Sequence, residues 1–340
     1  MKKIMSVILS IILCFSLSIP VFAATEDPNI EGFNLPSESS KADFTLISKY
    51  PSGNVSESVD SNKTVRIYTK DTKPNLESTE EETKEVLLEL GMESIAVENL
   101  SNSEMKELNN SSTITATTSY IKVDENSNVS YVTEEEALYE AAKIQAKGYA
   151  GQDTIQDTYM RVWHALSYLG NGAYHVITDA RWLNMPFWRS TDAIGACVQF
   201  LTITGGTQEG YYSYDTTTVT TTSTKKTSSG NIKITNVKSA SDGNFYGCAG
   251  LFNLPKDLST SSKTVKHSNL FAHFSYKGHM NFPTTTTYFN STGTYIHVQI
   301  GVQISPSLTV TTKGSSGAIS LTTSYKQEPR PVYLEILYVP

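Results

Sequence analysis

The sequence of 340 residues is poor in cysteine and in charge, and it has one long hydrophobic run. Three cysteines are too few for a disulfide-rich miniprotein, and the 18% of charged residues is low for a globular protein. After the first 23 residues, no stretch is long and apolar enough to predict a membrane span. The formal net charge of -7 excludes a strongly basic nucleic-acid binder.

The sequence also lacks the motifs of the common catalytic and cofactor sites. It contains no GxSxG, no HExxH, no Walker loop, no complete GxGxxG, no EF-hand loop and no CxxC. Each absence counts against one class of enzyme, although a site can also be built from residues far apart in the sequence. We therefore expect no cofactor, and a non-enzymatic protein is favoured over an enzyme.

The first 23 residues are typical of a secretory signal peptide. Lys2 and Lys3 supply a positive start, an apolar run follows over 4–19, and a V-F-A cleavage pattern ends at Ala23. We expect cleavage after Ala23 and a mature chain that is extracellular and has no membrane span.

Cleavage would remove Cys14 and leave Cys197 and Cys248 in the mature chain. An even pair of cysteines in an exported protein can form one disulfide. Two buried free thiols are the alternative, and the sequence leaves both open.

Charge divides the mature chain into two regions. Residues 24–145 hold 24 acidic and 10 basic side chains, whereas residues 146–340 hold 10 acidic and 15 basic ones. We predict a flexible polar lead over 24–62, an acidic α+β region over 63–148 and a Ser/Thr-rich β domain over 149–340. The acidic region is either a pro-region that shields the β domain by charge complementarity or a small permanent domain.

Hydrophobic periodicity predicts the fold class. Acid-rich N-termini preceded by Ser or Thr predict helices that begin near Ser78 and Thr133, and a shorter helix is expected over 103–108. Strict alternation then predicts strands, with a hairpin of 158–168 and 174–182 as one example. We expect an α+β chain, in which a small acidic helix-containing region precedes an antiparallel all-β sandwich or open barrel.

Aromatic side chains supply the candidate binding residues. Rings beside acids or arginines can stack on sugar faces while the polar groups bind hydroxyls, although tyrosines also populate ordinary strand edges. Two clusters have this composition, and their candidate residues are Tyr211, Tyr212, Tyr214, Asp215, Trp182, Trp188 and Arg189.

The histidines do not predict a metal site. His267, His273 and His279 recur every six residues. On an extended strand, six residues span about 20 Å, so these three side chains are too far apart to share one ion. We expect no metal.

The sequence favours a secreted, non-enzymatic binding protein whose partner is a glycan or another cell-surface component. A hydrolase with a site built from His273 and Asp215 on the β domain is the alternative. A membrane-active toxin is the third, although Thr216–Ser229 lacks the apolar alternation of a membrane-crossing hairpin.

Overall fold

A computed structural model describes most of the chain after its N-terminal segment. The described residues are 44–60, 63–71, 78–147, 157–186, 189–281, 287–298, 307–313, 316–322 and 327–338. All of them belong to one compact unit, Ser39–Pro340. The predicted signal peptide, its cleavage after Ala23, and Trp188 lie outside the described residues.

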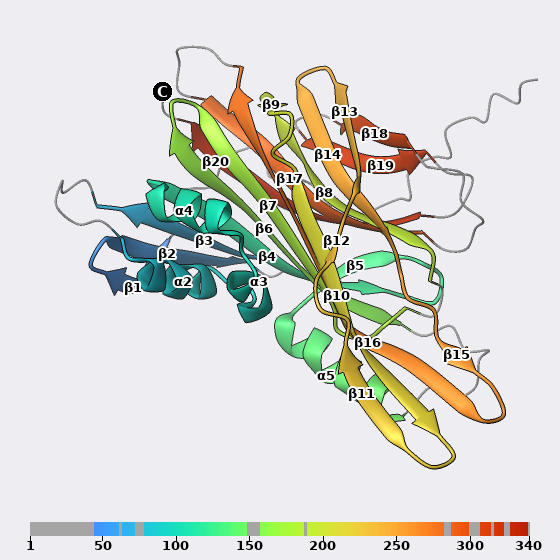
Figure 1. Cartoon of the computed structure of the whole chain (residues 1–340). Coiled ribbons are helices and arrows are strands. Elements are labelled where there is room, and N and C mark those ends of the chain that lie inside the picture. The colour runs from blue at the N-terminus through green and yellow to red at the C-terminus, as the bar shows by residue number, and fades with distance from the viewer. Residues whose placement is uncertain are drawn as a thin grey trace, which may run out of the picture. The chain divides into compact units, whose positions relative to one another are not determined.

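The larger sheet, sheet A, joins both halves of the chain (Figure 1). Among the described residues it has 13 strands, in the order β1-β2-β3-β4-β6-β7-β16-β10-β11, with β5, β9, β12 and β15 paired beside this path. Its strands are β1 (Thr45–Tyr50), β2 (Gly53–Asp60), β3 (Lys63–Lys70), β4 (Thr113–Val123), β5 (Val129–Val132), β6 (Thr158–Gly170), β7 (Ala173–Trp182), β9 (Leu201–Ile203), β10 (Glu209–Thr220), β11 (Thr224–Ser228), β12 (Ile232–Lys233), β15 (Leu258–Ser259) and β16 (Lys263–Met280).

The described residues form two further, smaller sheets. Sheet B has the order β13-β14-β8-β17-β20, and sheet C is the pair β18-β19. Their strands are β8 (Thr191–Gln199), β13 (Asn236–Asp242), β14 (Phe245–Asn253), β17 (Thr287–Val298), β18 (Ser307–Lys313), β19 (Ser316–Thr322) and β20 (Gln327–Tyr338). Neighbouring strands run antiparallel, so the expectation of a β-rich, antiparallel chain is confirmed.

Side chains alternate between the two faces of sheet B, and each face packs into a different core. Val162 and Val176 of sheet A pack with Ile194 of sheet B in the main core. Ile296 points to the opposite side of sheet B and packs against sheet C, where Val310 lies. A period of two residues therefore places consecutive side chains in different cores.

In the described part of the chain, four helices lie on the side of sheet A that faces away from sheet B, which we call the helix side. They are α2 (Glu80–Glu89), α3 (Ser94–Glu98), α4 (Asn102–Asn110) and α5 (Glu134–Lys147). Leu87 and Leu108 of the helices pack on Trp163 and Phe271 of the sheet. The α5 helix covers the same side through Ala137, which packs with Tyr159.

Local signals explain where these helices start. The Thr79 side chain accepts a hydrogen bond from Glu82 N at 3.1 Å, and it caps α2. Ser101 and Glu104 form a reciprocal capping box at the start of α4. The helices predicted near Ser78 and Thr133 and over 103–108 are thus confirmed.

The flexible lead predicted over 24–62 is wrong for its second half. Residues 45–60 form β1 and β2, which pair with each other, and β2 also pairs with β3. Val55 is fully buried in the core on the helix side, and this burial offsets the entropy of ordering a polar segment. Residues 24–43 of the lead lie outside the described residues.

Sheet A continues across the boundary predicted at residue 148. Strand β4, from the acidic region, pairs with β6, from the β domain, along its whole length, from Thr113–Tyr168 to Val123–Thr158. A processing step near this boundary stays a prediction.

Cys197 and Cys248 are free thiols, which is one of the two alternatives left open above. They lie on the paired strands β8 and β14, but Cys248 faces the main core and Cys197 faces sheet C. Burial raises the pKa of Cys197 to about 12 and that of Cys248 to about 11, so both remain protonated near neutral pH.

Candidate functional site

Three arginines from three strands lie on the helix side of sheet A. Arg66 is on β3, Arg161 on β6 and Arg181 on β7. Arg161 and Arg181 are directly paired across the two strands, so their side chains project from the same face. Arg161 is two residues from Trp163, which packs under the helices, and this spacing sets its direction.

These arginines line a pocket of about 640 Å³, which we call the arginine pocket. Its walls come from strands β3, β4, β6, β7 and β16, from the α2–α3 turn and from α5. The lining residues are Thr64, Arg66, Leu88, Gly91, Met92, Glu93, Thr118, Tyr120, Glu134, Leu138, Arg161, Arg181, Trp182, Leu183 and Asn269. Three cations, two carboxylates, several hydroxyls and an apolar rim thus share one concave surface.

Glu93 partly neutralises this cluster. It precedes α3 at the N-cap position, and its carboxylate contacts Arg161 at 3.5 Å and also pairs with Arg181. The Arg181 side chain is still 39% exposed, whereas that of Glu93 is only 13% exposed. Arg181 is therefore the cation most open to a ligand.

Backbone carbonyls at the C-terminus of α2 hold two of the arginines in place. Arg66 donates to Glu89 O at 2.8 Å, and Arg161 donates to Gly91 O. Trp163 Nε1 donates to Leu90 O at 2.9 Å. These carbonyls are the negative end of the helix, so cationic donors satisfy both their hydrogen bonds and their dipole.

Polar groups with fixed directions surround the arginines. The Tyr120 hydroxyl donates to Glu134 at 2.6 Å, and burial together with this hydrogen bond raises the pKa of Tyr120 to about 12. Asn269 Nδ2 donates to Asp215 at 2.7 Å. The backbone of Asn269 has a φ of 55°, at a bulge in β16, and Asn tolerates this left-handed conformation better than most residues. The bulge is therefore what places this amide at the pocket.

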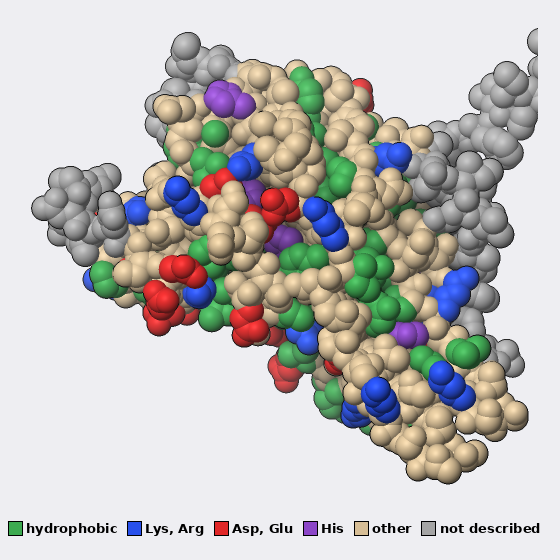
Figure 2. Space-filling view, in the orientation of Figure 1, with side chains coloured by type: hydrophobic (Ala, Val, Ile, Leu, Met, Phe, Trp, Pro, Cys, Tyr) green, Lys and Arg blue, Asp and Glu red, His purple; other side chains and the backbone are tan. Residues whose placement is uncertain are grey.

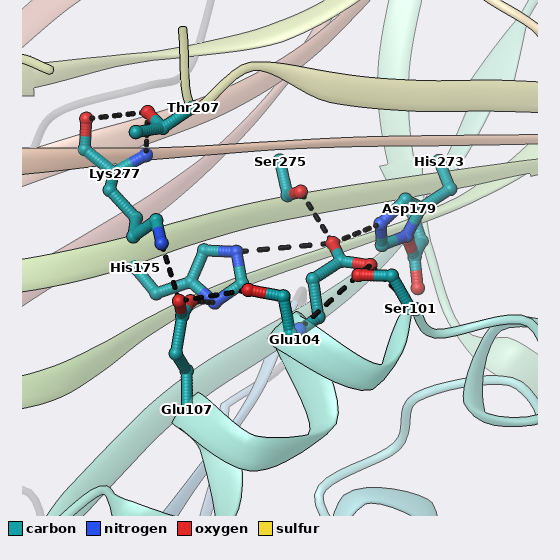
Figure 3. Close-up of polar contacts among 10 residues, drawn as sticks. Ser101, Glu104, Glu107, His175, Asp179, Thr207, His273, Ser275 and Lys277 are labelled. Carbon is teal, nitrogen blue, oxygen red and sulfur yellow. Dashed lines mark hydrogen bonds and ion pairs between the residues drawn. The ribbon is translucent and has the colours of Figure 1, made fainter. Parts of the chain in front are cut away.

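A second polar cluster lies buried under α4 (Figure 3). His273 Nδ1 is 2.7 Å from Asp179, and its Nε2 is 3.3 Å from Glu104 of α4. Glu104 also accepts a 2.6 Å hydrogen bond from Ser275 Oγ. All four side chains are nearly inaccessible, so their contacts with one another replace contacts with water.

The protonation states in this cluster follow from burial and charge. Burial alone would lower the pKa of His273, but the Asp179 and Glu104 carboxylates on either side raise it to about 10. Burial opposes the ionisation of Glu104, but the contacts with His273 and Ser275 hold its pKa well below the usual range. His273 is thus an imidazolium between two carboxylates near neutral pH.

His175, in the same cluster, has the opposite protonation state and is neutral near neutral pH. Burial lowers its pKa to about 4, although Glu104 and Glu107 are near. Lys277 pairs with Glu107 and lessens the influence of that carboxylate. The cluster fastens α4 to β7 and β16 and offers no open face to a substrate.

A third cluster of polar side chains lies between sheets A and B. Asp192 accepts hydrogen bonds from Tyr295 at 2.5 Å and from His297 at 2.9 Å. Trp182 Nε1 donates to Tyr295 at 3.0 Å, and the Arg330 guanidinium lies 4.2 Å from the Trp182 ring. These residues are buried, so the group supports the sheet interface rather than a surface site.

The structure separates the tyrosines predicted to form one binding cluster. Tyr212 and Tyr214 stack with a centroid distance of 6.3 Å on the side of sheet A that faces the main core. Tyr211 projects to the helix side and stacks on His273 at 5.0 Å. Tyr212 lines a smaller pocket of about 260 Å³, and Asp215 lies beside the arginine pocket through Asn269.

The other predicted residues are also distributed over different places. Trp182 lines the arginine pocket, although only 2% of it is exposed. Arg189 donates to Pro255 O at 3.1 Å and forms a 2.5 Å ion pair with Asp257, which fixes a loop. Of the residues named for the hydrolase alternative, His273 contacts Asp179, whereas Asp215 accepts from Asn269.

The described part of the chain contains no group of three or more His, Cys, Asp and Glu side chains arranged for a metal ion. His267 contacts Asp257, His273 contacts Asp179, and His279 contacts the carbonyl of Met280. Within the same residues, no helix combines the length and hydrophobicity needed to cross a bilayer.

No protein-family model matches the sequence, and no curated protein is significantly similar to it. Among the residues that line the arginine pocket, Trp182 is the only one that the sequence predicted as a binding residue. The arginines of the pocket are 95 and 20 residues apart in the sequence, and only the pairing of strands brings them together.

Proposed function

We propose that this protein is an exported binding protein that holds the carboxylate of an acidic sugar in the arginine pocket. The observation that carries the proposal is the pairing of Arg161 and Arg181 on one face, beside a concave surface of about 640 Å³. Guanidinium groups match carboxylates in shape and charge, and paired donors add direction to the attraction.

The pocket already holds one carboxylate in this manner. Glu93 contacts both arginines from within the chain, and Arg181 keeps 39% of its side chain exposed. A ligand carboxylate on the open edge of Arg181 would use donors that Glu93 leaves available. This internal contact supports a carboxylate as the ligand group rather than a neutral hydroxyl.

The remaining lining suits a sugar. Thr64, Thr118 and Asn269 supply hydroxyl and amide groups around the arginines. Leu88 and Leu138 are 45% and 47% exposed at the rim, where the C–H face of a pyranose could cover them. Apolar walls with a few directed polar groups are typical of small-molecule sites.

The proposal is for binding rather than hydrolysis. The histidine closest in character to a general base, His273, is enclosed by Asp179 and Glu104 and lies under α4. In the arginine pocket, Glu93 and Glu134 are engaged with arginines and with Tyr120. The packed sheets then act as a β-sandwich scaffold that fixes the pocket.

An external location belongs to the same proposal. The signal peptide predicted up to Ala23 would send the chain out of the cell, where acidic polysaccharides occur. The pocket takes Arg66 and Thr118 from the acidic region and Arg181 from the β domain. The functional form is therefore the mature chain with both regions present, and mass spectrometry of the secreted protein should find one species that starts at Ala24.

A pair of matched ligands tests the function. Titration calorimetry should show binding of trigalacturonate and at least tenfold weaker binding of its methyl ester, which keeps the sugar and removes the charge. Equal affinity for the two ligands would overturn the role of the carboxylate. Failure to bind trigalacturonate would overturn the proposed ligand class.

A further inference from the structure

The helix side of sheet A extends beyond the arginine pocket onto a projecting ribbon. The ribbon consists of β11, the end of β10 from Asp215, the start of β16 up to Ser268, and β15 (Figure 1). Its strands pair as β11-β10-β16-β15. Both of its faces carry mainly Thr, Ser and Lys, and β11 is exposed at every residue.

The pairing shows which lysines share the face of the pocket. Tyr211 points to the helix side, since it stacks on His273, and Asp215 and Thr217 follow it at even spacing along β10. Thr217 lies opposite Lys226 of β11 and opposite Lys266 of β16. Residues directly opposite each other project from the same face, so both lysines lie on the helix side.

The other two lysines of the ribbon lie on its opposite face. Lys225 is opposite Thr218, and Lys263 is opposite Thr220. These threonines alternate with Thr217 along β10 and therefore point away from the helix side. The ribbon thus carries two lysines on each face, and only one face is continuous with the pocket.

Asn269 connects the pocket to the ribbon. It lines the arginine pocket and bonds to Asp215, whose partner across the strands is Ser268. Lys266 lies five residues from Phe271, the residue paired with Arg181, which corresponds to about 16 Å along an extended strand. Basic side chains are visible on the front of the ribbon in Figure 2.

We propose that this face is a track for a linear acidic polysaccharide, with one uronate in the arginine pocket and further uronates over Lys226 and Lys266. This inference rests on the proposed function and names its ligand as a polymer rather than a single sugar. A repeated negative charge fits cations that are spaced along one face, and hydroxyls such as that of Thr217 can bind the sugar units between them. A polymer that engages both parts gains affinity because the second contact is intramolecular.

The acidic groups along the track are already engaged with the protein. Asp215 accepts from Asn269, Glu93 pairs with Arg161 and Arg181, and Glu134 accepts from Tyr120. The ribbon has exposed apolar side chains at Val219 and Leu258, but they lie on opposite faces because their cross-strand partners, Thr264 and Val265, are consecutive. This pattern favours a polysaccharide over insertion into a lipid bilayer.

The test compares ligand length in two matched variants. For the wild-type protein, polygalacturonate should bind at least fivefold tighter per site than trigalacturonate, and this gain should shrink as salt is raised. The double variant Lys226→Gln/Lys266→Gln should bind polygalacturonate about fivefold more weakly and so lose most of this gain. A loss of this size is expected when two exposed ion pairs with the ligand are removed. Lys225→Gln/Lys263→Gln removes the same charge from the other face and should keep the gain within twofold.

Three results would overturn the track. The first is equal affinity for polygalacturonate and trigalacturonate, which would leave the proposed function intact while removing the polymer. The second is an equal effect of the two double variants, which would show a general charge effect. The third is a larger effect of Lys226→Gln/Lys266→Gln on the binding of anionic phospholipid vesicles than on the binding of polygalacturonate. If neither sugar ligand binds, the proposed function itself fails.

Discussion

Arg161 and Arg181 lie directly opposite each other on β6 and β7, and Glu93 contacts both. Two like charges at directly opposed positions destabilise a sheet, so this pair needs an anion. Glu93 supplies one from the turn between α2 and α3. Under the proposed function, the same arrangement would favour carboxylate ligands, because the arginine positions are already fixed around one.

Replacing Glu93 tests whether this internal carboxylate competes with the ligand. Glu93→Gln should lower the free energy of unfolding by about 1–3 kcal/mol, because the arginines lose their partly buried counter-charge. It should also raise the affinity for trigalacturonate several-fold. Urea unfolding and calorimetry measure the two effects, and a loss of binding would instead show that Glu93 contacts the ligand favourably.

Replacing Glu104 tests the cluster under α4. Glu104→Gln should lower the free energy of unfolding by about 3 kcal/mol, because a buried imidazolium at His273 loses one of its two carboxylates. Glu98→Gln, on the exposed side of α3, should change it by less than about 0.5 kcal/mol. Similar losses in the two variants would contradict the importance of the buried contact.

Two buried histidines predict loss of stability in mild acid. Burial lowers the pKa of His164 and that of His175 to about 4, from an ordinary value of 6.5. Between these values, the unfolded chain binds two protons that the folded chain does not, so the free energy of unfolding should fall as pH falls, by about 2–3 kcal/mol per pH unit. His175→Gln should remove about half of this slope in urea unfolding from pH 6.5 to pH 4, and an unchanged slope would contradict the assignment.

His273 predicts the opposite change at alkaline pH. Its pKa is raised from 6.5 to about 10 in the folded protein, so its contribution to stability is complete below pH 6.5 and is lost as pH rises through 10. The free energy of unfolding should therefore decline above neutral pH as well, with a maximum between the two declines. Urea unfolding of the wild-type protein from pH 7 to pH 10 measures this, and a constant stability over that range would contradict a charged His273.

Gly293 tests the contact between sheets A and B. An added Cβ would lie 2.6 Å from the Cβ and Cγ of His164, whose ring is held by Ser291 at 2.7 Å and by Ile177 O at 3.0 Å. Gly293→Ala should therefore lower the free energy of unfolding by about 1–3 kcal/mol. Gly205→Ala, where an added Cβ meets nothing within 4 Å, should leave thermal unfolding nearly unchanged; equal effects would contradict the close packing at Gly293.

The local elements were predictable from the sequence because their signals are local. The caps at Thr79 and Ser101 and the acids that follow them specify helix starts. Alternation and the turn residues Asn171 and Gly172 specify the hairpin of β6 and β7, in which both turn residues have positive φ. Hydrophobic alternation did not predict β1 and β2, because their partly exposed faces carry mostly polar residues.

The pocket was not predictable because it depends on register. A regular hairpin around Asn171 and Gly172 would pair Arg161 with Trp182, but the irregularity between Tyr168 and Gly170 moves its partner to Arg181. A second irregularity in β16 places Asn269 at the rim. Gly170 and Asn269 adopt positive φ at these two irregularities, but a single Gly or Asn does not predict a bulge from the sequence, so the aromatic clusters were the more visible signal.

The binding role of the arginine pocket is tested most directly by calorimetric titration of trigalacturonate into the wild-type protein, Arg181→Gln and Lys225→Gln. Arg181 is the most exposed cation of the pocket pair, whereas Lys225 lies on the far face of the ribbon. Arg181→Gln should weaken binding at least tenfold, and Lys225→Gln should leave it unchanged within twofold. Wild-type affinity in Arg181→Gln would contradict the assignment of the arginine pocket as the ligand site.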